Sequence, residues 1–130
     1  GSVIPYPKPL ALSKWSCETL GIAVEGEETL VTAADLGAVV AQGGTQLTDI
    51  VVAEFGHPTK ELVPLPKSDA VPVLLGLAFN HFKDPGRAFR IATDVAAKTR
   101  VWKLSYADPQ GAAVTLRDQF GPGGANSLAV

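Results

Sequence analysis

Residues 67–100 read KSDAVPVLLGLAFNHFKDPGRAFRIATDVAAKTR and contain the longest apolar run of the chain, 70–82. A helix there would be capped by Asp69 and would place Pro72 in its first turn, where the missing N–H costs no intrahelical hydrogen bond. A strand is the open alternative, because alternate residues from Val71 to Phe79 are apolar. We prefer the helix. Because a compact domain packs its other elements around one such segment, we expect this run to lie at the centre of the fold.

The segment after this run predicts a second helix, over residues 85–99. Asp84 is a suitable N-cap, and Pro85 occupies the first helical position, where proline is favoured. The apolar residues that follow recur at helical spacing and form one stripe: Ala88, Ile91, Ala92, Val95 and Ala96. Residues 70–99 therefore predict a two-helix central region.

The C-terminal part predicts a β-hairpin. Apolar residues alternate with polar ones in two short runs, at Trp102, Leu104 and Tyr106 and again at Val114 and Leu116. Between these runs, Asp108-Pro109-Gln110-Gly111 suits a type I turn followed by a glycine at positive φ. The resulting register places Leu104 opposite Leu116 and Lys103 opposite Arg117.

The N-terminal half predicts shorter elements. Ser13 can cap a helix that ends before Gly21, and residues 22–24 and 29–31 form a candidate hairpin with an acidic tip. Thr32, with Asp35 three residues later, is a good N-cap for a helix over 33–41. Residues 47–55 fit a helical stripe as well as a strand, and we prefer the strand because 50–52 are β-branched.

These elements predict an α+β fold in a single domain, with an antiparallel sheet that includes the C-terminal hairpin and packs against the two-helix region. The chain of 130 residues has the length of one domain, and its 46% hydrophobic and 18% charged residues are typical of globular proteins. We divide it into a proline-containing arm (1–12), the domain (13–120) and a glycine-rich tail (121–130). The arm alternates proline with other residues at Pro5, Pro7 and Pro9, which makes it stiff and extended.

Composition also bounds the cellular setting. Cys17 is the single cysteine, so no internal disulfide is possible and a reducing compartment is the simpler interpretation. No apolar run reaches the roughly 18–20 residues of a spanning helix, and no secretory signal pattern is present. We therefore expect a soluble, cytoplasmic protein without a membrane partner.

Charge is unevenly distributed along the chain. Residues 1–66 carry three lysines and eight acidic residues, a balance of 3 − 8 = −5, and residues 67–130 carry eight basic and five acidic residues, a balance of 8 − 5 = +3. Complementary halves allow copies of the chain to stack head to tail. The alternative is that both halves are simply hydrated.

Two histidines are candidates for chemistry. His57 follows Glu54 by three residues, which suits a general base with its orienting carboxylate or a pair of metal ligands. Asn80 and His81 end the central run and would form a polar corner of a ligand pocket. The competing interpretations are a surface-loop His57 and a His81 that only satisfies a hydrogen bond. We interpret Cys17 as buried and inert rather than as a nucleophile.

No sequence motif assigns a catalytic residue, a metal or a cofactor. The chain has no phosphate-binding glycine loop, no paired CxxC cysteines and no GxSxG or HExxH sequence. Residues 32–55 could be drawn as a helix–turn–helix, but its second helix would present no Lys or Arg. A basic patch is formed by Lys98, Arg100, Lys103 and Arg117. Without exposed aromatic residues between these cations, nucleic acid is a poor candidate partner, and the patch is kept as a candidate protein-interaction surface.

The function expected from these observations is binding of protein rather than catalysis. In the arm, Ile4, Tyr6 and Leu10 offer apolar anchors between prolines, and we expect them to lie on a neighbouring subunit or in a groove beside the sheet, with Tyr6 at least partly buried. The chain is then a structural or protein-binding subunit whose partner is itself, in an oligomer or larger assembly. The alternative is a small-molecule sensor or enzyme domain, with a pocket between the central run and the sheet that includes Glu54, His57, Asn80 and His81.

Overall fold

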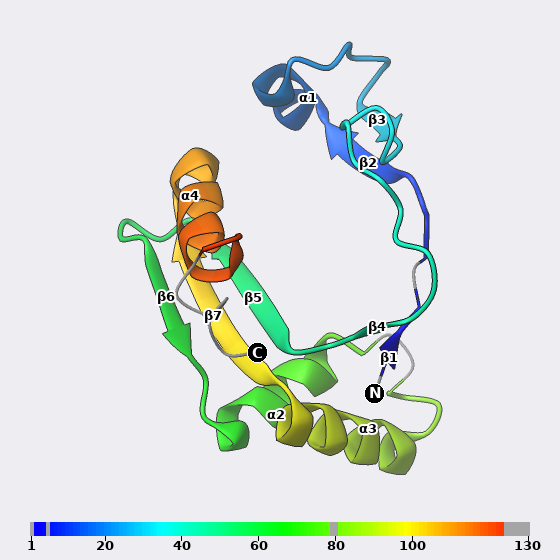
Figure 1. Ribbon diagram of the computed structural model, residues 1–130, viewed down its shortest axis with the longest axis vertical. Helices are drawn as coiled ribbons and strands as arrows, with labels where there is room; N and C mark the ends of the chain where they lie inside the picture. The colour runs from blue at the N-terminus through cyan, green and yellow to red at the C-terminus, as the bar shows by residue number, and fades with distance from the viewer. Residues whose placement is uncertain (1, 5, 79–80, 124–130) are drawn as a thin grey trace. The chain divides into compact units, whose positions relative to one another are not determined.

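The computed structural model describes residues 2–4, 6–78 and 81–123. These residues form two compact units, one of residues 2–46 and one that begins at Leu47 (Figure 1). Both helices and strands are present, so the predicted α+β class is confirmed, whereas the division into arm, domain and tail stays a prediction. The elements are β1 (Ser2–Val3), β2 (Leu10–Ser13), α1 (Lys14–Leu20), β3 (Glu28–Val31), β4 (Thr45–Gln46), β5 (Asp49–Phe55), β6 (Glu61–Pro64), α2 (Lys67–Gly76), α3 (Pro85–Lys98), β7 (Arg100–Tyr106) and α4 (Pro109–Phe120).

The first unit is built on a two-stranded antiparallel pair, β2 with β3, which aligns Leu10 with Val31. Helix α1 follows β2 directly, as predicted. The Ser13 side chain accepts a hydrogen bond of 3.2 Å from the backbone N–H of Ser16, and Gly21 ends the helix at φ 69°. Cys17 of this helix is fully buried, as the sequence indicates.

Two expectations for the first unit are wrong. Residues 22–24 do not pair with 29–31, because β2 supplies the partner of β3 instead. The arm is therefore held within its own chain at both ends, since β1 also pairs with β4. No helix forms over 33–41. Asp35 accepts a hydrogen bond of 2.8 Å from the Thr32 N–H, as in a capping box, but Gly37 turns the chain at φ 67° and Val39 beyond it is exposed. The larger apolar side chains that follow the cap are exposed rather than packed against another element, so the capped turn does not extend.

The second unit contains a three-stranded sheet in the order β5-β7-β6. The predicted strand at 47–55 is confirmed as β5. The sheet is mixed rather than antiparallel, because β5 runs parallel to β7, with Asp49 opposite Arg100, whereas β6 runs antiparallel to β7. A parallel neighbour requires a crossover connection, and β6, α2 and α3 together provide it.

The two-helix central region is confirmed as α2 and α3. Helix α2 ends at Gly76, earlier than the predicted run, and follows Pro66 without the side-chain cap expected from Asp69. Helix α3 begins as predicted, because the Asp84 carboxylate accepts a hydrogen bond of 2.9 Å from the Arg87 N–H. Phe79 and Asn80, at the end of the predicted central helix, lie outside the described residues.

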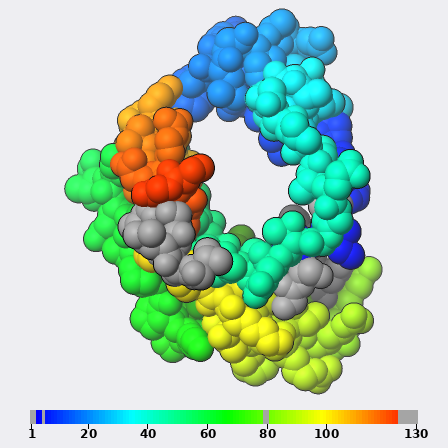
Figure 2. All heavy atoms as spheres, in the orientation of Figure 1, coloured from blue at the N-terminus to red at the C-terminus, as the bar shows by residue number. Residues whose placement is uncertain are grey.

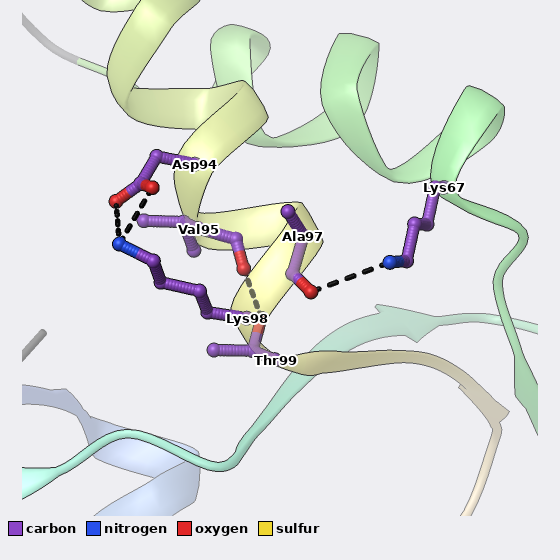
Figure 3. Close-up of polar contacts among 6 residues, drawn as sticks. All are labelled: Lys67, Asp94, Val95, Ala97, Lys98 and Thr99. Atoms are coloured by element: carbon purple, nitrogen blue, oxygen red, sulfur yellow. Dashed lines mark hydrogen bonds and ion pairs between the residues drawn. The ribbon is translucent and has the colours of Figure 1, made fainter.

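The helix pair packs on the sheet through small and β-branched side chains. Ala70 of α2, Ala96 of α3 and Val101 of β7 are buried together, and Ile50 and Val52 of β5 pack against them. One polar contact connects the start of α2 to the end of α3, and another closes the C-terminus of α3 (Figure 3). Lys67 Nζ donates to the Ala97 carbonyl oxygen over 3.3 Å, and the Thr99 hydroxyl donates to the Val95 carbonyl oxygen over 2.8 Å. The alanines allow the two helices and the sheet to approach closely.

The predicted C-terminal hairpin is wrong. Residues 109–120 form helix α4, which begins at Asp108, whose carboxylate accepts a hydrogen bond of 2.8 Å from the Gly111 N–H. Gly111 is therefore helical rather than at positive φ. Leu104 lies opposite Ala53 and Leu62 instead of Leu116. The Asp-Pro pair that suits a turn suits a helix start equally well, and β7 finds both of its neighbours elsewhere in the chain.

Helix α4 covers the sheet face opposite to α2 and α3. Side chains alternate between the faces of a strand, so Trp102 and Leu104 point away from the face to which Val101 belongs. The Trp102 ring meets the Phe120 ring of α4 edge to face, with centroids 5.8 Å apart. Leu104 is fully buried, and Ala112 of α4 is nearly so. The sheet therefore lies between two helical layers.

Candidate functional site

A cleft of about 610 Å³ opens between α2 and α3. Its volume lies within the roughly 300–1,000 Å³ of ligand pockets. The described residues that line it come from α2, from α3 or from the connection between them: Leu74, Ala78, His81, Lys83, Asp84, Arg87, Ala88, Ile91, Ala92 and Val95. Figure 2 shows the yellow-green to yellow atoms of α3 lying at the surface. The cleft is thus an open feature of the second unit alone.

The floor of the cleft is apolar. It follows from the spacing of α3, where Ala88, Ile91, Ala92 and Val95 recur every three or four residues and form one stripe. The inner side of the stripe is closed, because Ala92 is buried, whereas Ile91 is 53% exposed. Leu74 of α2 supplies the opposite wall. An exposed isoleucine in such a stripe marks an apolar surface without a covering element.

The charged residues of the cleft gather where the connection enters α3. Asp84 is already engaged as the N-cap of α3. The side chains of Lys83 and Arg87 are exposed and make no ion pair within the described part of the chain. Among the cations elsewhere in the chain, Lys14, Lys98, Arg100 and Lys103 each pair with a carboxylate. With two cations and the Asp84 carboxylate, the rim carries a balance of 2 − 1 = +1.

His81 lines the same cleft and also makes a local hydrogen bond. Its Nδ1 lies 2.7 Å from the Ala78 carbonyl oxygen. Because a carbonyl oxygen can only accept, Nδ1 carries the proton, and Nε2 remains for a second interaction. The His81 ring also lies against the Phe82 ring, with centroids 3.7 Å apart. His81 therefore lines the cleft and makes a local hydrogen bond at the same time, so the two interpretations of this residue are compatible. Asn80, its neighbour in the sequence, lies outside the described residues.

Glu54 and His57 come together, as predicted, but not in the cleft. His57 Nε2 lies 3.3 Å from Glu54 Oε2, and Lys103 Nζ lies 2.5 Å from the same oxygen. The hydrogen bond and charge of Lys103, followed by those of His57, lower the pKa of Glu54. All three side chains are between 41% and 48% exposed. The carboxylate that would orient His57 as a base is shared with Lys103, and the cluster does not line the cleft, so it favours a structural contact.

The candidate basic patch is largely neutralised. Lys98 pairs with Asp94 at 2.6 Å (Figure 3), and Arg100 pairs with Asp49 at 2.8 Å. Lys103 pairs with Glu54 as described above. Arg117 lies on α4, exposed, and does not face Lys103 as the hairpin register predicted. These contacts leave little net charge with which β7 could attract an anionic partner.

The candidate anchors of the arm are all exposed in the first unit. Ile4 is 80%, Tyr6 84% and Leu10 54% exposed. Leu10 belongs to β2, whereas Ile4 and Tyr6 lie between β1 and β2. Tyr6 is therefore not buried by its own chain, and its expected burial against a neighbouring subunit stays a prediction.

Neither metal ligands nor membrane-spanning helices are found in the residues that the structure describes. No cluster of three or more His, Cys, Asp or Glu side chains forms there. Over the same residues, no helix combines the length and the apolar character that crossing a bilayer requires. Comparisons with protein family models, curated proteins and solved structures find no match for this chain. Its function is therefore inferred from the arrangement of its own residues.

Sequence reasoning missed Lys83 and Arg87 as site residues. Both cations lie at the start of α3, on either side of the capping Asp84 and outside the apolar stripe by which the helix is recognised. The sequence nevertheless contains a signal that identifies these two cations. Arg87 precedes Ile91 by four residues and Lys83 precedes Arg87 by four, so their positions continue one edge of the stripe beyond its apolar part.

Proposed function

We propose that this protein is a non-enzymatic, protein-binding subunit that associates with further copies of itself. The observation that carries the proposal is the exposed apolar surface of the first unit. Besides Ile4, Tyr6 and Leu10, the side chains of Trp15, Leu20, Val24, Leu30, Leu36, Val39 and Val40 are exposed there, and Val39 reaches 93%.

The exposed apolar surface of the first unit is large compared with the few apolar side chains that this unit buries. The buried apolar side chains of the first unit are Cys17 and Val31. Small units bury too little surface to be stable alone and need a metal, a disulfide or a partner surface. Cys17 is a free thiol, and the described residues hold no metal-ligand cluster. The surface of another protein molecule would supply the missing burial.

Charge favours a second copy as that partner. Residues 2–46 carry two basic and five acidic side chains, a balance of 2 − 5 = −3, whereas residues 47–130 carry nine basic and eight acidic ones, a balance of 9 − 8 = +1. Units of unlike charge attract, so contact between the first unit of one copy and the second unit of another is electrostatically favoured. A heterologous contact of this kind adds copies head to tail.

The test is the molar mass of the full chain in solution, measured by light scattering over a hundredfold range of concentration. The expected result is a mass that rises with concentration for the unaltered sequence. The double variant Ile4→Ser/Tyr6→Ser should stay monomeric and keep its circular dichroism spectrum. Val114→Ser removes an exposed apolar side chain from α4 of the second unit and serves as the matched control. An unaltered chain that is monomeric throughout would contradict self-association.

A second candidate function is a small-molecule-binding domain, and the cleft between α2 and α3 is the observation that favours it. The cleft lies between the two helices rather than between the central run and the sheet. Its polar residues include no nucleophile beside a base, so binding is better supported than catalysis. Glu54 and His57 do not line it.

A further inference from the structure

We propose that the cleft between α2 and α3 binds a single-chain amphiphile that ends in a carboxylate. The apolar chain lies along the floor formed by Ala88, Ile91 and Val95, and the carboxylate lies between Lys83 and Arg87 at the rim. This inference rests on the second candidate function, small-molecule binding, and is independent of self-association.

The lining of the cleft has an aliphatic part and a charged part, which favours an amphiphile over a ligand that is polar throughout. Toward the C-terminal half of α3 the lining is aliphatic, from Ala88 through Ile91 and Ala92 to Val95, with Leu74 opposite. Toward the start of α3 it is charged, at Lys83, Asp84 and Arg87. A ligand that satisfies both parts has one apolar end and one ionic end.

The charge of the rim selects the head group. Asp84 is turned toward the Arg87 N–H by its capping hydrogen bond, which leaves the two cationic side chains for the ligand. Two cations and one carboxylate give a rim balance of 2 − 1 = +1 with His81 neutral, which one carboxylate neutralises. A phosphate monoester carries about −1.5 to −2 charges at neutral pH and would meet Asp84 with an unbalanced charge. Arg87 also presents the planar fork that binds carboxylates in bidentate fashion.

The position of the unpaired cations supports a ligand instead of a merely hydrated surface. Other exposed cations also lack an ion pair in the part of the chain that the structure describes, Arg90 of the same helix among them, so a missing ion pair alone does not mark a site. Lys83 and Arg87 are the rim cations of the cleft, and neither forms an ion pair within the described ranges. Hydrated cations are ordinary on surfaces, but two of them beside an apolar cleft give its mouth a net positive charge, which attracts anions there.

The experiment is isothermal titration of the full chain with octanoate and decanoate below their aggregation concentrations. Methyl decanoate and decyl phosphate serve as comparison ligands. We expect one saturable site, with decanoate binding about three- to tenfold more tightly than octanoate, since each buried methylene contributes up to about fourfold. Methyl decanoate and decyl phosphate should both bind at least about fivefold more weakly than decanoate.

Matched variants locate the head group. Lys83→Gln/Arg87→Gln should weaken decanoate binding about tenfold, because two charge-assisted hydrogen bonds are lost. The control is Arg90→Gln, which removes one positive charge from α3 at a residue outside the lining named above and should change affinity less than twofold. All three side chains are exposed, and circular dichroism checks that each variant is folded. Amide NMR shifts should concentrate on α2 and α3.

Each outcome decides the proposal. Equal affinity for decanoate and its methyl ester, or an unchanged affinity in the double variant, overturns the carboxylate assignment but leaves a neutral ligand for the cleft. Tighter binding of decyl phosphate overturns the charge argument in favour of a phosphate head. If no amphiphile binds, the small-molecule function fails as well. If Ile91→Ser abolishes self-association and no amphiphile binds, the cleft is an interface between copies, and the proposal is overturned.

Discussion

Asp49 Oδ1 accepts a hydrogen bond of 2.8 Å from the indole Nε1 of Trp102, across the parallel pair β5 and β7. The same carboxylate accepts from Arg100, whose Nη2 lies 2.9 Å from Oδ2. The Asp49 side chain is only 15% exposed. Two donors from the central strand thus fix the first residue of β5, and this contact sets the register of the parallel pair.

Removing the charge of Asp49 should destabilise the second unit. Burial acts to raise the pKa of Asp49, but hydrogen bonds from Arg100 and Trp102 outweigh it and hold the pKa below its ordinary value of 3.8. A carboxyl group with a lowered folded-state pKa stabilises the fold above its unfolded-state pKa, and this contribution is lost as the pH falls through the folded-state value. Asp49→Asn should therefore cost about 1–2 kcal/mol at pH 7 and much less at pH 3.

The measurement is urea unfolding at both pH values in a Trp15→Phe background, so that Trp102 is the fluorescent reporter. Asp94→Asn is the control, since Asp94 is exposed and its pair with Lys98 is worth only tenths of a kcal/mol. A cost for Asp49→Asn that is equal at pH 7 and pH 3 would show that the charge of Asp49 is not what stabilises the strand pair.

Gly111 and Asp108 should be energetically coupled at the start of α4. A Cβ at Gly111 would lie 2.7 Å from Asp108 Oδ2, so that an alanine there displaces the capping carboxylate. Gly111→Ala alone should gain helix propensity but lose the cap, with little net change in the free energy of unfolding. In an Asp108→Ala background the same substitution should stabilise by about 1 kcal/mol. Chemical denaturation of the four proteins measures the coupling, and additive effects would mean that the cap is not formed.

Two glycines at helix ends should respond in opposite ways to alanine. At Gly76, the last residue of α2, an added Cβ would meet no other atom within 4 Å, so Gly76→Ala should stabilise by about 0.5–1 kcal/mol. At Gly121, after α4, a Cβ would collide with the Arg117 carbonyl oxygen, and Gly121→Ala should destabilise by about 1–3 kcal/mol. Thermal unfolding distinguishes the two. A stabilising Gly121→Ala would mean that the chain leaves α4 by another path.

Cys17 should report the opening of the first unit separately from the second. Its side chain is fully buried, so a thiol reagent reaches it only after local unfolding. Leu104→Ala, in the core of the second unit, should cost about 2–5 kcal/mol there and leave the Cys17 labelling rate unchanged. Val31→Ala, in the first unit, should raise that rate. If Leu104→Ala and Val31→Ala both raise the labelling rate of Cys17, the two units unfold together.

The sequence predicts best those elements whose signals are local. Ser13 and Gly21 bound α1, and Asp84 with Pro85 starts α3, because a cap acts within one helical turn of the residues it serves. The N-terminal cap at Thr32 shows the limit of this reasoning. Its contact with Asp35 forms, yet no helix follows, because helix propagation depends on an apolar face packed against other elements.

The prediction of a C-terminal hairpin failed for a related reason. Val114 and Leu116 alternate over too few residues to distinguish a strand from the helical stripe of Ala112, Leu116 and Phe120. Distant chain segments decide between the two, since β5 and β6 occupy both edges of β7. In the site, His81 is predictable because a histidine at the end of an apolar run stands out, whereas Lys83 and Arg87 resemble the ordinary charged residues of a helix start.

The parallel pairing of β5 with β7 has a consequence for biosynthesis. Asp49 and Arg100 lie opposite each other, yet they are separated by 51 positions in the chain. At about 5–20 residues per second, a ribosome needs roughly 3–10 s to complete that interval. During this time β5 has no partner strand, and its centre, Ile50 to Ala53, contains no proline or charge to discourage intermolecular pairing. Nascent chains arrested before Arg100 should therefore be the species that chaperones bind.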